Sequence, residues 1–416
     1  MLIPNKIAYN VRDTEKAMLR HLTQPDCAGI RVRTGPVIRK RNYVMRLTLA
    51  PCSLYLFVLL LLLSVSVSVS AQSLGPAFQI VEHAVADGSI PGAALLIMQH
   101  GKLIEQRTFG VCEIDPKRPF ERDTICWIAS LTKPITATAA MKLVEQGKLQ
   151  LDTPIENYLP QFSKLATNEG KPHSVTIRQL MSHTSGIPAS VPLREPYFFT
   201  QRWFDRTLTE VVDAIAQRPL DFAPGSQVNY SNAAPYVLGR IIEVSSGKAF
   251  GEFLRSEIFE PLQMDDTGFS VAAAATNRTA VIYRREAGAL SVFCRYDPKW
   301  QVRMTMPDGG LFSTPKDIAL FANSFLNNGR GILSDDSVKT MLTEQSAGYG
   351  LGWILDKENQ FSHWGSSGTL VWTDQKTGIV GVFFSQIQDF NLLAKLRNRV
   401  RNAIDEEFVS TSKAAK

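Results

Sequence analysis

Residues 361–386, FSHWGSSGTLVWTDQKTGIVGVFFSQ, contain the pattern that decides the fold. Two apolar runs, residues 370–372 and 379–384, flank the polar segment TDQKTG. Short runs rich in Val, Trp and Phe favour β-strands, and Asp and Gly between them favour a hairpin turn. The stretch therefore predicts a pair of antiparallel strands near the end of the chain. A further strand is expected just before it, over YGLGWILD, residues 349–356.

A second hairpin is predicted near the other end of the chain. Residues 92–111, GAALLIMQHGKLIEQRTFGV, contain two strand-like runs joined at His100-Gly101. Helical spacing dominates between the two hairpins, and a last helix is predicted over residues 391–404. This order predicts an α+β domain in which one antiparallel sheet is built from both chain ends and flanked by helices. About residues 135–345 would form a helical insertion, or subdomain, in the middle.

Composition and charge are those of a globular protein. The chain has 416 residues, of which 44% are hydrophobic and 20% charged, so it is long enough for a large core. The net charge of +6 arises at the start: residues 1–71 contain ten Lys or Arg and three Asp or Glu, which leaves 35 and 36 for residues 72–416. The body of the chain is therefore nearly neutral, and this balance does not favour nucleic acid as a partner.

The basic start precedes a membrane-targeting pattern. Residues Leu54 to Leu63 form an unbroken apolar core of signal-peptide length. We expect residues 45–71 to be a signal peptide cleaved after Ala71, and residues 1–44 to be a basic leader or an over-called start. The alternative is an uncleaved anchor over residues 51–71, because about 20 residues suffice to cross a bilayer. Both alternatives export the body of the chain to the periplasm or the medium.

A candidate nucleophile lies at the start of a predicted helix. The pattern Ser-x-x-Lys occurs four times, at Ser130, Ser245, Ser313 and Ser410. Only Ser130 follows a strand-like run and opens a long helical segment, in CWIASLTKPITATAAMKLVEQGKL. Three residues along a helix give a rise of about 4.5 Å, so the amine of Lys133 can reach the Ser130 hydroxyl. A capping serine followed by a surface lysine is the alternative for this segment taken alone.

Two further motifs follow in order. A Tyr-x-Asn motif occurs once, at residues 230–232, and a His-Trp-Gly motif follows at residues 363–365. With Ser130 and Lys133 before them, their order and spacing resemble the class C β-lactamase and D,D-peptidase family of SxxK serine hydrolases, which includes esterases. The resemblance covers about residues 76–405. It implies a β-lactamase or penicillin-binding transpeptidase-like fold, so the body of the chain is expected to be one serine hydrolase domain.

The resemblance implies a role for each matching residue. Ser130 would be the acylated nucleophile, with Lys133 and Tyr230 sharing proton transfer as its general base pair. Asn232 would hold Lys133 and the substrate carbonyl. The backbone N–H groups of Ser130 and Ser366 would form the oxyanion hole. No metal and no cofactor is implied, and the six histidines form no His-Glu-x-x-His motif.

The third motif departs from the common pattern of the family. His363 stands where many relatives carry lysine, an exchange also seen within the family. Trp364 replaces the small hydroxyl residue that usually helps to hold a β-lactam or peptide carboxylate. With Gly365, these residues are expected to line the substrate site. A bulky indole suits an apolar acyl or alkyl group better than a carboxylate, and esterases of the family show similar departures.

Two other motifs are expected to lie outside the catalytic machinery. A literal Lys-Thr-Gly occurs at residues 376–378, within the predicted turn, so we expect Lys376 to be exposed to solvent and not catalytic. His183, in SHTSG, is expected to make hydrogen bonds within a loop and not to act as a base.

Three cysteines follow Ala71 in the sequence. Cys112 follows the second strand of the hairpin predicted over residues 92–111, and Cys126 lies in the apolar run before the candidate nucleophile. An exported compartment permits disulfides, and neighbouring strands would bring these two together. Cys294 would then be left as a free thiol.

These expectations favour an exported serine hydrolase that acts through an acyl-enzyme on short-chain carboxylic esters. Its partners would be small molecules, namely an ester, β-lactam or peptide substrate, with membrane contact only through the N-terminal segment. The alternative enzyme is a β-lactamase or D,D-carboxypeptidase acting on cell-wall peptides. A non-catalytic penicillin- or peptide-binding protein on the same fold is a third hypothesis, although such a protein has no need of an intact base pair.

Overall fold

A computed structural model describes residues 74–191, 206–286, 288–298, 305–326 and 331–414. The chain divides into two compact units, Met1–Val69 and Ser70–Lys416, and the described residues all belong to the second. The predicted leader and signal peptide lie outside the described residues. Among the described helices, none is long and apolar enough to cross a membrane.

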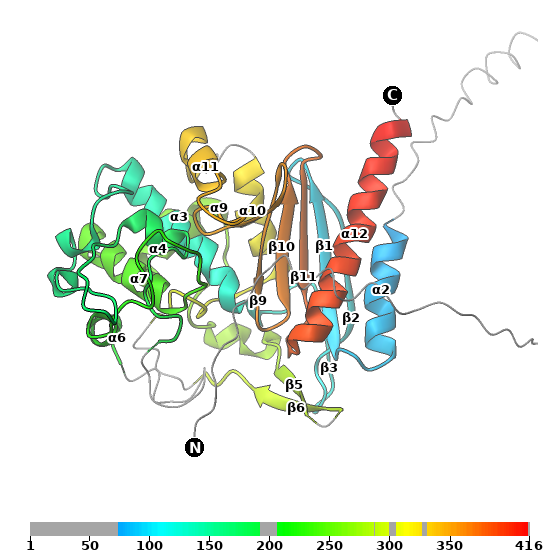
Figure 1. Cartoon of the computed structure of the whole chain (residues 1–416). Helices are drawn as coiled ribbons and strands as arrows, with labels where there is room; N and C mark the ends of the chain where they lie inside the picture. The colour runs from blue at the N-terminus through cyan, green and yellow to red at the C-terminus, as the bar shows by residue number, and fades with distance from the viewer. Residues whose placement is uncertain (1–73, 192–205, 287, 299–304, 327–330, 415–416) are drawn as a thin grey trace, which may run out of the picture. The chain divides into compact units, whose positions relative to one another are not determined.

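A seven-stranded antiparallel sheet lies at the centre of the fold (Figure 1). Its strands are β1 Gly92–Gln99, β2 Lys102–Glu113, β3 Arg118–Pro119, β8 Ile354–Lys357, β9 Gln360–Gly365, β10 Thr369–Asp374 and β11 Ile379–Phe384. The strand order is β3-β2-β1-β11-β10-β9-β8. Because β1 pairs with β11, with Ala94 opposite Phe384, the two ends of the body meet in one sheet. The predicted closure of the sheet from both chain ends is confirmed.

Both faces of the sheet are covered because successive side chains of a strand point to opposite sides. Leu95 and Ile97 of β1 pack against the terminal helices α2 (Gly75–Ala86) and α12 (Phe390–Ala414), which lie side by side in Figure 1. The intervening Leu96 joins the larger core on the other face. The sheet is thus a layer between a pair of terminal helices and the helical middle of the chain.

The middle of the chain is mainly helical, as predicted, but it also contains short strands. Its helices are α3 Thr132–Glu145, α4 Ile177–Met181, α6 Leu208–Ala216, α7 Ala233–Ser246, α8 Phe250–Leu254, α9 Glu260–Leu262, α10 Pro315–Leu326 and α11 Asp335–Met341. Single 3₁₀ or π turns occur at Ala129–Leu131, Ile155–Asn157, Pro160–Phe162, Arg255–Phe259 and Ala273–Arg278. Two small sheets use β4 Cys126–Trp127, β5 Ile282–Glu286, β6 Ala289–Cys294, β7 Phe312–Ser313 and β12 Ile387–Gln388.

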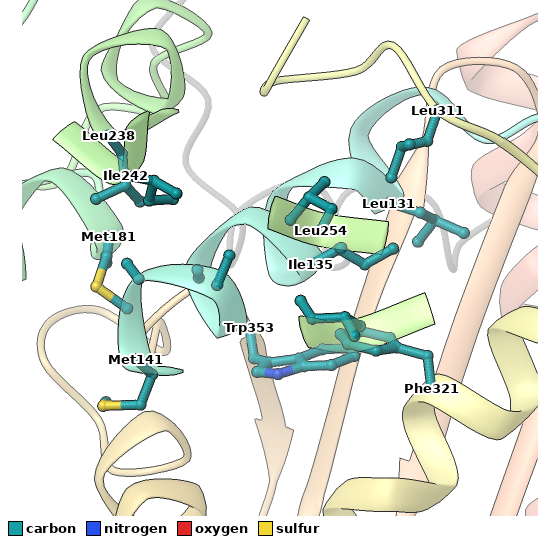
Figure 2. Close-up of a cluster of buried hydrophobic side chains, with 14 of the residues drawn as sticks. Leu131, Ile135, Met141, Met181, Leu238, Ile242, Leu254, Leu311, Phe321 and Trp353 are labelled. Carbon is teal, nitrogen blue, oxygen red and sulfur yellow. The ribbon is translucent and has the colours of Figure 1, made fainter. Parts of the chain in front are cut away.

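Helix α3 runs through the interior of the fold. Every side chain from Thr132 to Met141 is buried. Ile135 packs in the same core as Leu254, Phe321 and Trp353, side chains that come from three separate parts of the chain (Figure 2). A helix held on all sides in this way is a rigid support for whatever its N-terminus carries.

The predicted strand over YGLGWILD is wrong in its first half. β8 begins only at Ile354, and residues 351–353 form a bend. Gly352 has a φ of +85°, and a Cβ at this position would lie 2.5 Å from the Cβ of Ala137 in α3. The chain bends here because it approaches the buried helix too closely to continue as a strand.

The expected disulfide between Cys112 and Cys126 is also wrong. Both residues and Cys294 are free thiols. Cys112 lies in β2 of the large sheet, whereas Cys126 lies in β4, which pairs in a different sheet. Burial raises the pKa of both thiols, and this favours the protonated, unreactive form.

Candidate active site

Ser130 lies in a single 3₁₀ turn, Ala129–Leu131, directly before α3. Ala129 has a φ of +47°, a left-handed conformation that residues other than glycine adopt rarely. The backbone just before it is held by the sheet, because the carbonyl of Ile128 accepts a hydrogen bond from Thr369 Oγ1 at 3.0 Å. The start of β10 therefore fixes the turn that carries Ser130.

Lys133 is buried one turn into the helix, and its amine has three oxygen partners. Nζ donates to Ser130 Oγ at 3.0 Å, to Asn232 Oδ1 at 2.8 Å and to the backbone carbonyl of Asp308 at 2.8 Å. The structure thus brings together Ser130, Lys133 and Asn232 as predicted, although they come from distant parts of the chain. These contacts bring a buried amine beside the Ser130 hydroxyl, and these are the two groups between which proton transfer is predicted.

Tyr230 stands beside this pair but presents its ring to it. Lys133 Nζ lies over the Tyr230 ring, 4.9 Å from the ring centroid. The centroids of the Tyr230 and His183 rings are 4.5 Å apart. The Tyr230 side chain is 38% exposed, so a substrate that approaches Ser130 can also contact it. The role predicted for its hydroxyl, to share proton transfer with Lys133, stays a prediction.

His363 is buried near Lys133 and is electrically neutral. Burial, with a smaller contribution from the positive charge of Lys133, lowers the pKa of His363 to about 3. Its Nε2 lies 3.1 Å from the hydroxyl of Tyr349, and its Nδ1 lies 3.0 Å from the backbone carbonyl of Trp364. At neutral pH His363 therefore contributes hydrogen bonds but no charge, unlike the lysine that many relatives carry.

Gly365 allows two backbones to approach closely beside Ser130. A Cβ on Gly365 would lie 2.3 Å from the carbonyl oxygen of Ile128 and 2.3 Å from Thr369 Oγ1. Ser366 follows Gly365 directly, and Ser130 lies two residues after Ile128. The two backbone N–H groups predicted for the oxyanion hole thus belong to the two segments that this contact joins.

Strand β9, whose end lies beside Ser130, extends beyond its neighbour β8. Within the described residues, the pairing of β8 with β9 ends where Ile354 lies opposite Ser362. Residues 363–365 of β9 continue beyond that point. An unpaired strand edge presents backbone donors and acceptors, and these are suited to hold the backbone-like atoms of a substrate.

Trp364 points to the opposite face of the sheet from His363. Its partner across the strands is Leu370, which packs on the face that α12 covers. The guanidinium of Arg397 lies over the indole, 4.7 Å from the ring centroid, and the ring of Phe390 meets it edge-on at 6.1 Å. Trp364 is 36% exposed, so it borders the strand edge as an aromatic surface backed by α12.

Two residues at the site were missed from the sequence. Asp308, whose carbonyl accepts from Lys133, also has a buried side chain, and burial raises the pKa of its carboxyl group. Tyr349 lies between two histidines, 3.2 Å from His183 Nε2 and 3.1 Å from His363 Nε2. The available signals were weak: Asp308 precedes a Gly-Gly pair, and Tyr349 opens a segment predicted to be a strand.

Two predictions concern residues that were expected to lie outside the catalytic machinery. Lys376 is exposed in the turn between β10 and β11, where its N–H donates to Asp374 Oδ1 at 2.8 Å, so the predicted turn is confirmed. His183 does make loop hydrogen bonds, since its Nδ1 accepts from the N–H of Ser231 at 3.1 Å. The part of the chain that the structure describes contains no group of three or more His, Cys, Asp or Glu placed to hold a metal ion.

Comparison with known sequences identifies relatives over most of the body of the chain. A family model described as Beta-lactamase matches residues 77–406. An uncharacterised protein of Mycobacterium tuberculosis is 33% identical over 282 residues, which cover 62% of this chain and 69% of that protein. Esterase EstB of Burkholderia gladioli is 34% identical over 211 residues, which cover 49% of this chain and 53% of the esterase. This chain thus spans about half the length of that esterase.

Solved structures share the same fold. EstCE1, described as a hydrolase with promiscuous acyltransferase activity, matches with a TM-score of 0.72 at 22% identity, over 81% of this chain and 100% of that one. A penicillin-binding protein homologue from Pyrococcus abyssi matches with a TM-score of 0.62 at 25% identity, over 75% of this chain and 73% of that one. Together with the family match over residues 77–406, these likenesses mean that the chain belongs to the Beta-lactamase family.

Proposed function

We propose that this protein is a serine hydrolase that forms an acyl-enzyme on Ser130 and acts on short-chain carboxylic esters. The observation that carries the proposal is the 3.0 Å contact between Lys133 Nζ and Ser130 Oγ at the start of a buried helix. A serine hydroxyl is a weak nucleophile until a neighbouring base accepts its proton. Lys133, which is held by Asn232 and the carbonyl of Asp308, is the base that we propose for that task.

In the proposed reaction, Ser130 Oγ attacks the ester carbonyl carbon while its proton passes to the base pair of Lys133 and Tyr230. The acceptor is the amine of Lys133 in its uncharged form, or the phenolate of Tyr230 while Lys133 carries its positive charge. The carbonyl oxygen becomes an oxyanion, for which the backbone N–H groups of Ser130 and Ser366 are the proposed donors. The base then returns the proton to the departing alcohol, and the acyl group stays on Ser130. Water, deprotonated by the same base, releases the acid and restores the hydroxyl.

The third motif supplies no positive charge for a substrate that carries a carboxylate, and this favours an ester. His363 is neutral, because burial lowers its pKa to about 3. The guanidinium of Arg397 is buried over the Trp364 ring and donates to the carbonyl of Leu393 at 3.1 Å, so it is already engaged within the protein. Trp364, at the border of the strand edge, carries an indole, which offers no hydroxyl group to hold a carboxylate and is better suited to an apolar group.

One of the similar proteins agrees with this substrate class, and a second agrees with a reaction that transfers an acyl group. Esterase EstB, with 34% identity over 211 residues, is by name an esterase. EstCE1 is described as a hydrolase with promiscuous acyltransferase activity. Both descriptions belong to those proteins, and for this chain they support the ester proposal.

The test measures turnover of short p-nitrophenyl esters, nitrocefin and a D-Ala-D-Ala peptide by the full-length protein. We expect ester turnover, and we expect Ser130→Ala to lower kcat/KM by about a thousandfold or more. Ser245→Ala is the matched control, since Ser245 belongs to the same Ser-x-x-Lys pattern but lies in α7. A fluorophosphonate probe should label the unmodified protein and Ser245→Ala but not Ser130→Ala. Ester turnover that survives Ser130→Ala would contradict the proposal.

A β-lactamase or D,D-carboxypeptidase is the second candidate, favoured by the likeness to the penicillin-binding protein homologue. Here the deciding residue is Trp364. We expect Trp364→Thr to raise nitrocefin turnover relative to ester turnover, because it replaces an indole by a small hydroxyl residue. If the unmodified protein hydrolyses nitrocefin faster than the esters, the second candidate replaces the first.

A further inference from the structure

A continuous chain of hydrogen bonds crosses the site beneath Tyr230. It begins at the backbone N–H of Ser231, 3.1 Å from His183 Nδ1. It continues from His183 Nε2 to the hydroxyl of Tyr349 at 3.2 Å, and from that hydroxyl to His363 Nε2 at 3.1 Å. It ends where His363 Nδ1 lies 3.0 Å from the backbone carbonyl of Trp364. The three side chains in the middle are all buried.

Both ends of this chain determine the position of every proton in it. The N–H of Ser231 can only donate, so His183 Nδ1 accepts and the ring proton of a neutral His183 is on Nε2. The carbonyl of Trp364 can only accept, so His363 carries its proton on Nδ1 and accepts at Nε2. The Tyr349 hydroxyl therefore accepts from His183 and donates to His363. Burial agrees with this assignment, because it lowers the pKa of both histidines and raises that of Tyr349.

The chain links the second and third motifs of the proposed active site. Its first member, Ser231, lies between Tyr230 and Asn232, and its last contact is the peptide group between Trp364 and Gly365. The His183 ring also supports the ring of Tyr230, with centroids 4.5 Å apart. His183 itself has a φ of +58°, a rare backbone conformation that its contacts must hold in place.

The two ends of the chain exclude one role for it. Both are backbone groups that neither gain nor lose protons near neutral pH, so the chain has no terminal donor from which a proton could be relayed. What the chain can do instead is fix the distance between the two segments that it joins. The Tyr349 hydroxyl bonds both imidazoles, and each of the three groups has one hydrogen-bonding arrangement in which its donor and acceptor are both used. The second and third motifs are therefore held at a fixed distance from each other.

We propose that Tyr349 is a positioning residue that holds the Tyr230 loop and the strand edge at residues 363–365 in fixed relation across Ser130. Tyr349 itself does not contact the substrate in this proposal; it acts through His183 and His363. The inference rests on the proposed hydrolase function, since it names a residue that prepares the site for that reaction.

The main test is Tyr349→Phe, which removes the shared hydroxyl and keeps the ring. Both histidines then lose a partner in the interior, and Tyr230 and the strand edge are free to shift. We expect kcat to fall by about tenfold to a hundredfold, because displacements of about an ångström have effects of this size, while KM changes little. Tyr283→Phe is the matched control: Tyr283 is also buried, and its hydroxyl accepts from the N–H of Ile114 at 2.7 Å. That control should retain full activity.

A double-variant cycle separates positioning from general loss of stability. Because Tyr349 acts on the Tyr230 loop through His183, the variant with both Tyr349→Phe and His183→Ala should lose less activity than the product of the two single losses. Losses that multiply, a change confined to KM, or a kcat for folded Tyr349→Phe within twofold of the unmodified protein would each overturn the proposal.

A measurement on the unmodified protein covers the case in which Tyr349→Phe does not fold. Nitrogen chemical shifts of selectively labelled histidines should show His183 with its proton on Nε2 and His363 with its proton on Nδ1. The opposite tautomer at either residue would overturn the proposal. If no ester, β-lactam or peptide is turned over, the proposed function fails, but the rate of fluorophosphonate labelling of Ser130 still reports on positioning and should fall in Tyr349→Phe.

Discussion

At the scale of single residues, two neutral histidines surround the positive charge of Lys133. Burial lowers the pKa of His363 to about 3 and that of His183 well below its usual range, and the charge of Lys133 lowers both further. The imidazoles therefore act as hydrogen-bonding groups near neutral pH. This arrangement makes the folded protein sensitive to acid, because protonation of a buried, partnered imidazole favours unfolding.

We expect the free energy of unfolding to fall as the pH is lowered from 6.5, the ordinary pKa of histidine, towards about 3, the pKa of His363 in the folded protein. Over this range the unfolded chain binds a proton at His363 that the folded chain does not, and one such group contributes a slope of about 1.4 kcal/mol per pH unit. Urea unfolding at several pH values should show a steeper slope for the unmodified protein than for His363→Gln. Equal slopes would show that His363 is not held neutral.

The two Lys-Thr-Gly-like positions offer a second prediction at this scale. Lys376→Ala should change kcat by less than about threefold, because an exposed turn lysine has no part in stabilising the transition state. His363→Ala should lower kcat by about tenfold or more, since it removes the group that joins Tyr349 to the strand edge. Steady-state kinetics on esters compares the two variants directly. A larger loss of kcat in Lys376→Ala than in His363→Ala would show that the turn at Lys376, and not the strand edge at His363, belongs to the active site.

At the scale of elements, the site depends on how the 3₁₀ turn before α3 packs against the end of β9 and the start of β10. Thr369 at the start of β10 holds the carbonyl of Ile128, and Ser367 Oγ donates to the carbonyl of Trp127 at 2.6 Å. The side chain of Gln386 also bonds both backbone groups of Trp127, at 3.1 and 3.0 Å. The sheet thus clamps the backbone just before the nucleophile, and α3 holds it from the other side.

Gly365→Ala tests this contact. A Cβ would lie 2.3 Å from the carbonyl oxygen of Ile128, so the strand end and the turn must move apart, and we expect kcat/KM to fall by about a hundredfold. Gly147→Ala is the control: Gly147 has a φ of +69° but no neighbour within 4 Å of a built Cβ. It should cost about 1 kcal/mol of stability with little loss of activity. Kinetics and thermal melting of both variants distinguish a local effect from a global one, and normal activity in Gly365→Ala would contradict the proposed close contact.

At the scale of the whole molecule, the sheet joins the two ends of the body and the site lies at its border with the helical middle. The amine of Lys133 bonds a carbonyl 175 positions later in the chain, and the clamp on Trp127 comes from a residue 259 positions away. Contacts of such separation form only when the sheet has closed. The active site is therefore completed only by the folded chain as a whole.

The start of the chain gives the prediction that concerns the molecule as a whole. We propose that residues 45–71 direct export and are removed after Ala71, which would leave residues 72–416 as the mature protein. N-terminal sequencing and intact mass of the exported protein should show this start. Ala71→Arg should block cleavage, because the enzyme that cleaves signal peptides requires a small residue at this position, while Ala71→Gly should be processed normally. Retention of residues 51–71 in the unmodified exported protein would favour the anchor alternative, and retention of the protein in the cytoplasm would contradict export.

The sequence by itself determined the parts of this protein that depend on local patterns. Strand-like apolar runs joined by turn residues indicated the two hairpins at the ends of the body, and the segment after Ser130 indicated the helix. The order of three short motifs indicated the Beta-lactamase family, which the family match over residues 77–406 confirms. These features could be predicted because each is specified by residues close together in the chain.

Only the tertiary structure decided which groups meet and which charges they carry. In the folded chain the carbonyl of Asp308 accepts from Lys133, and Tyr349 lies between two histidines. Trp364 points towards α12, and Cys112 is a free thiol. Each of these outcomes depends on contact or burial between segments far apart in sequence. Burial in particular is a property of the whole fold, and it is burial that keeps His363 neutral.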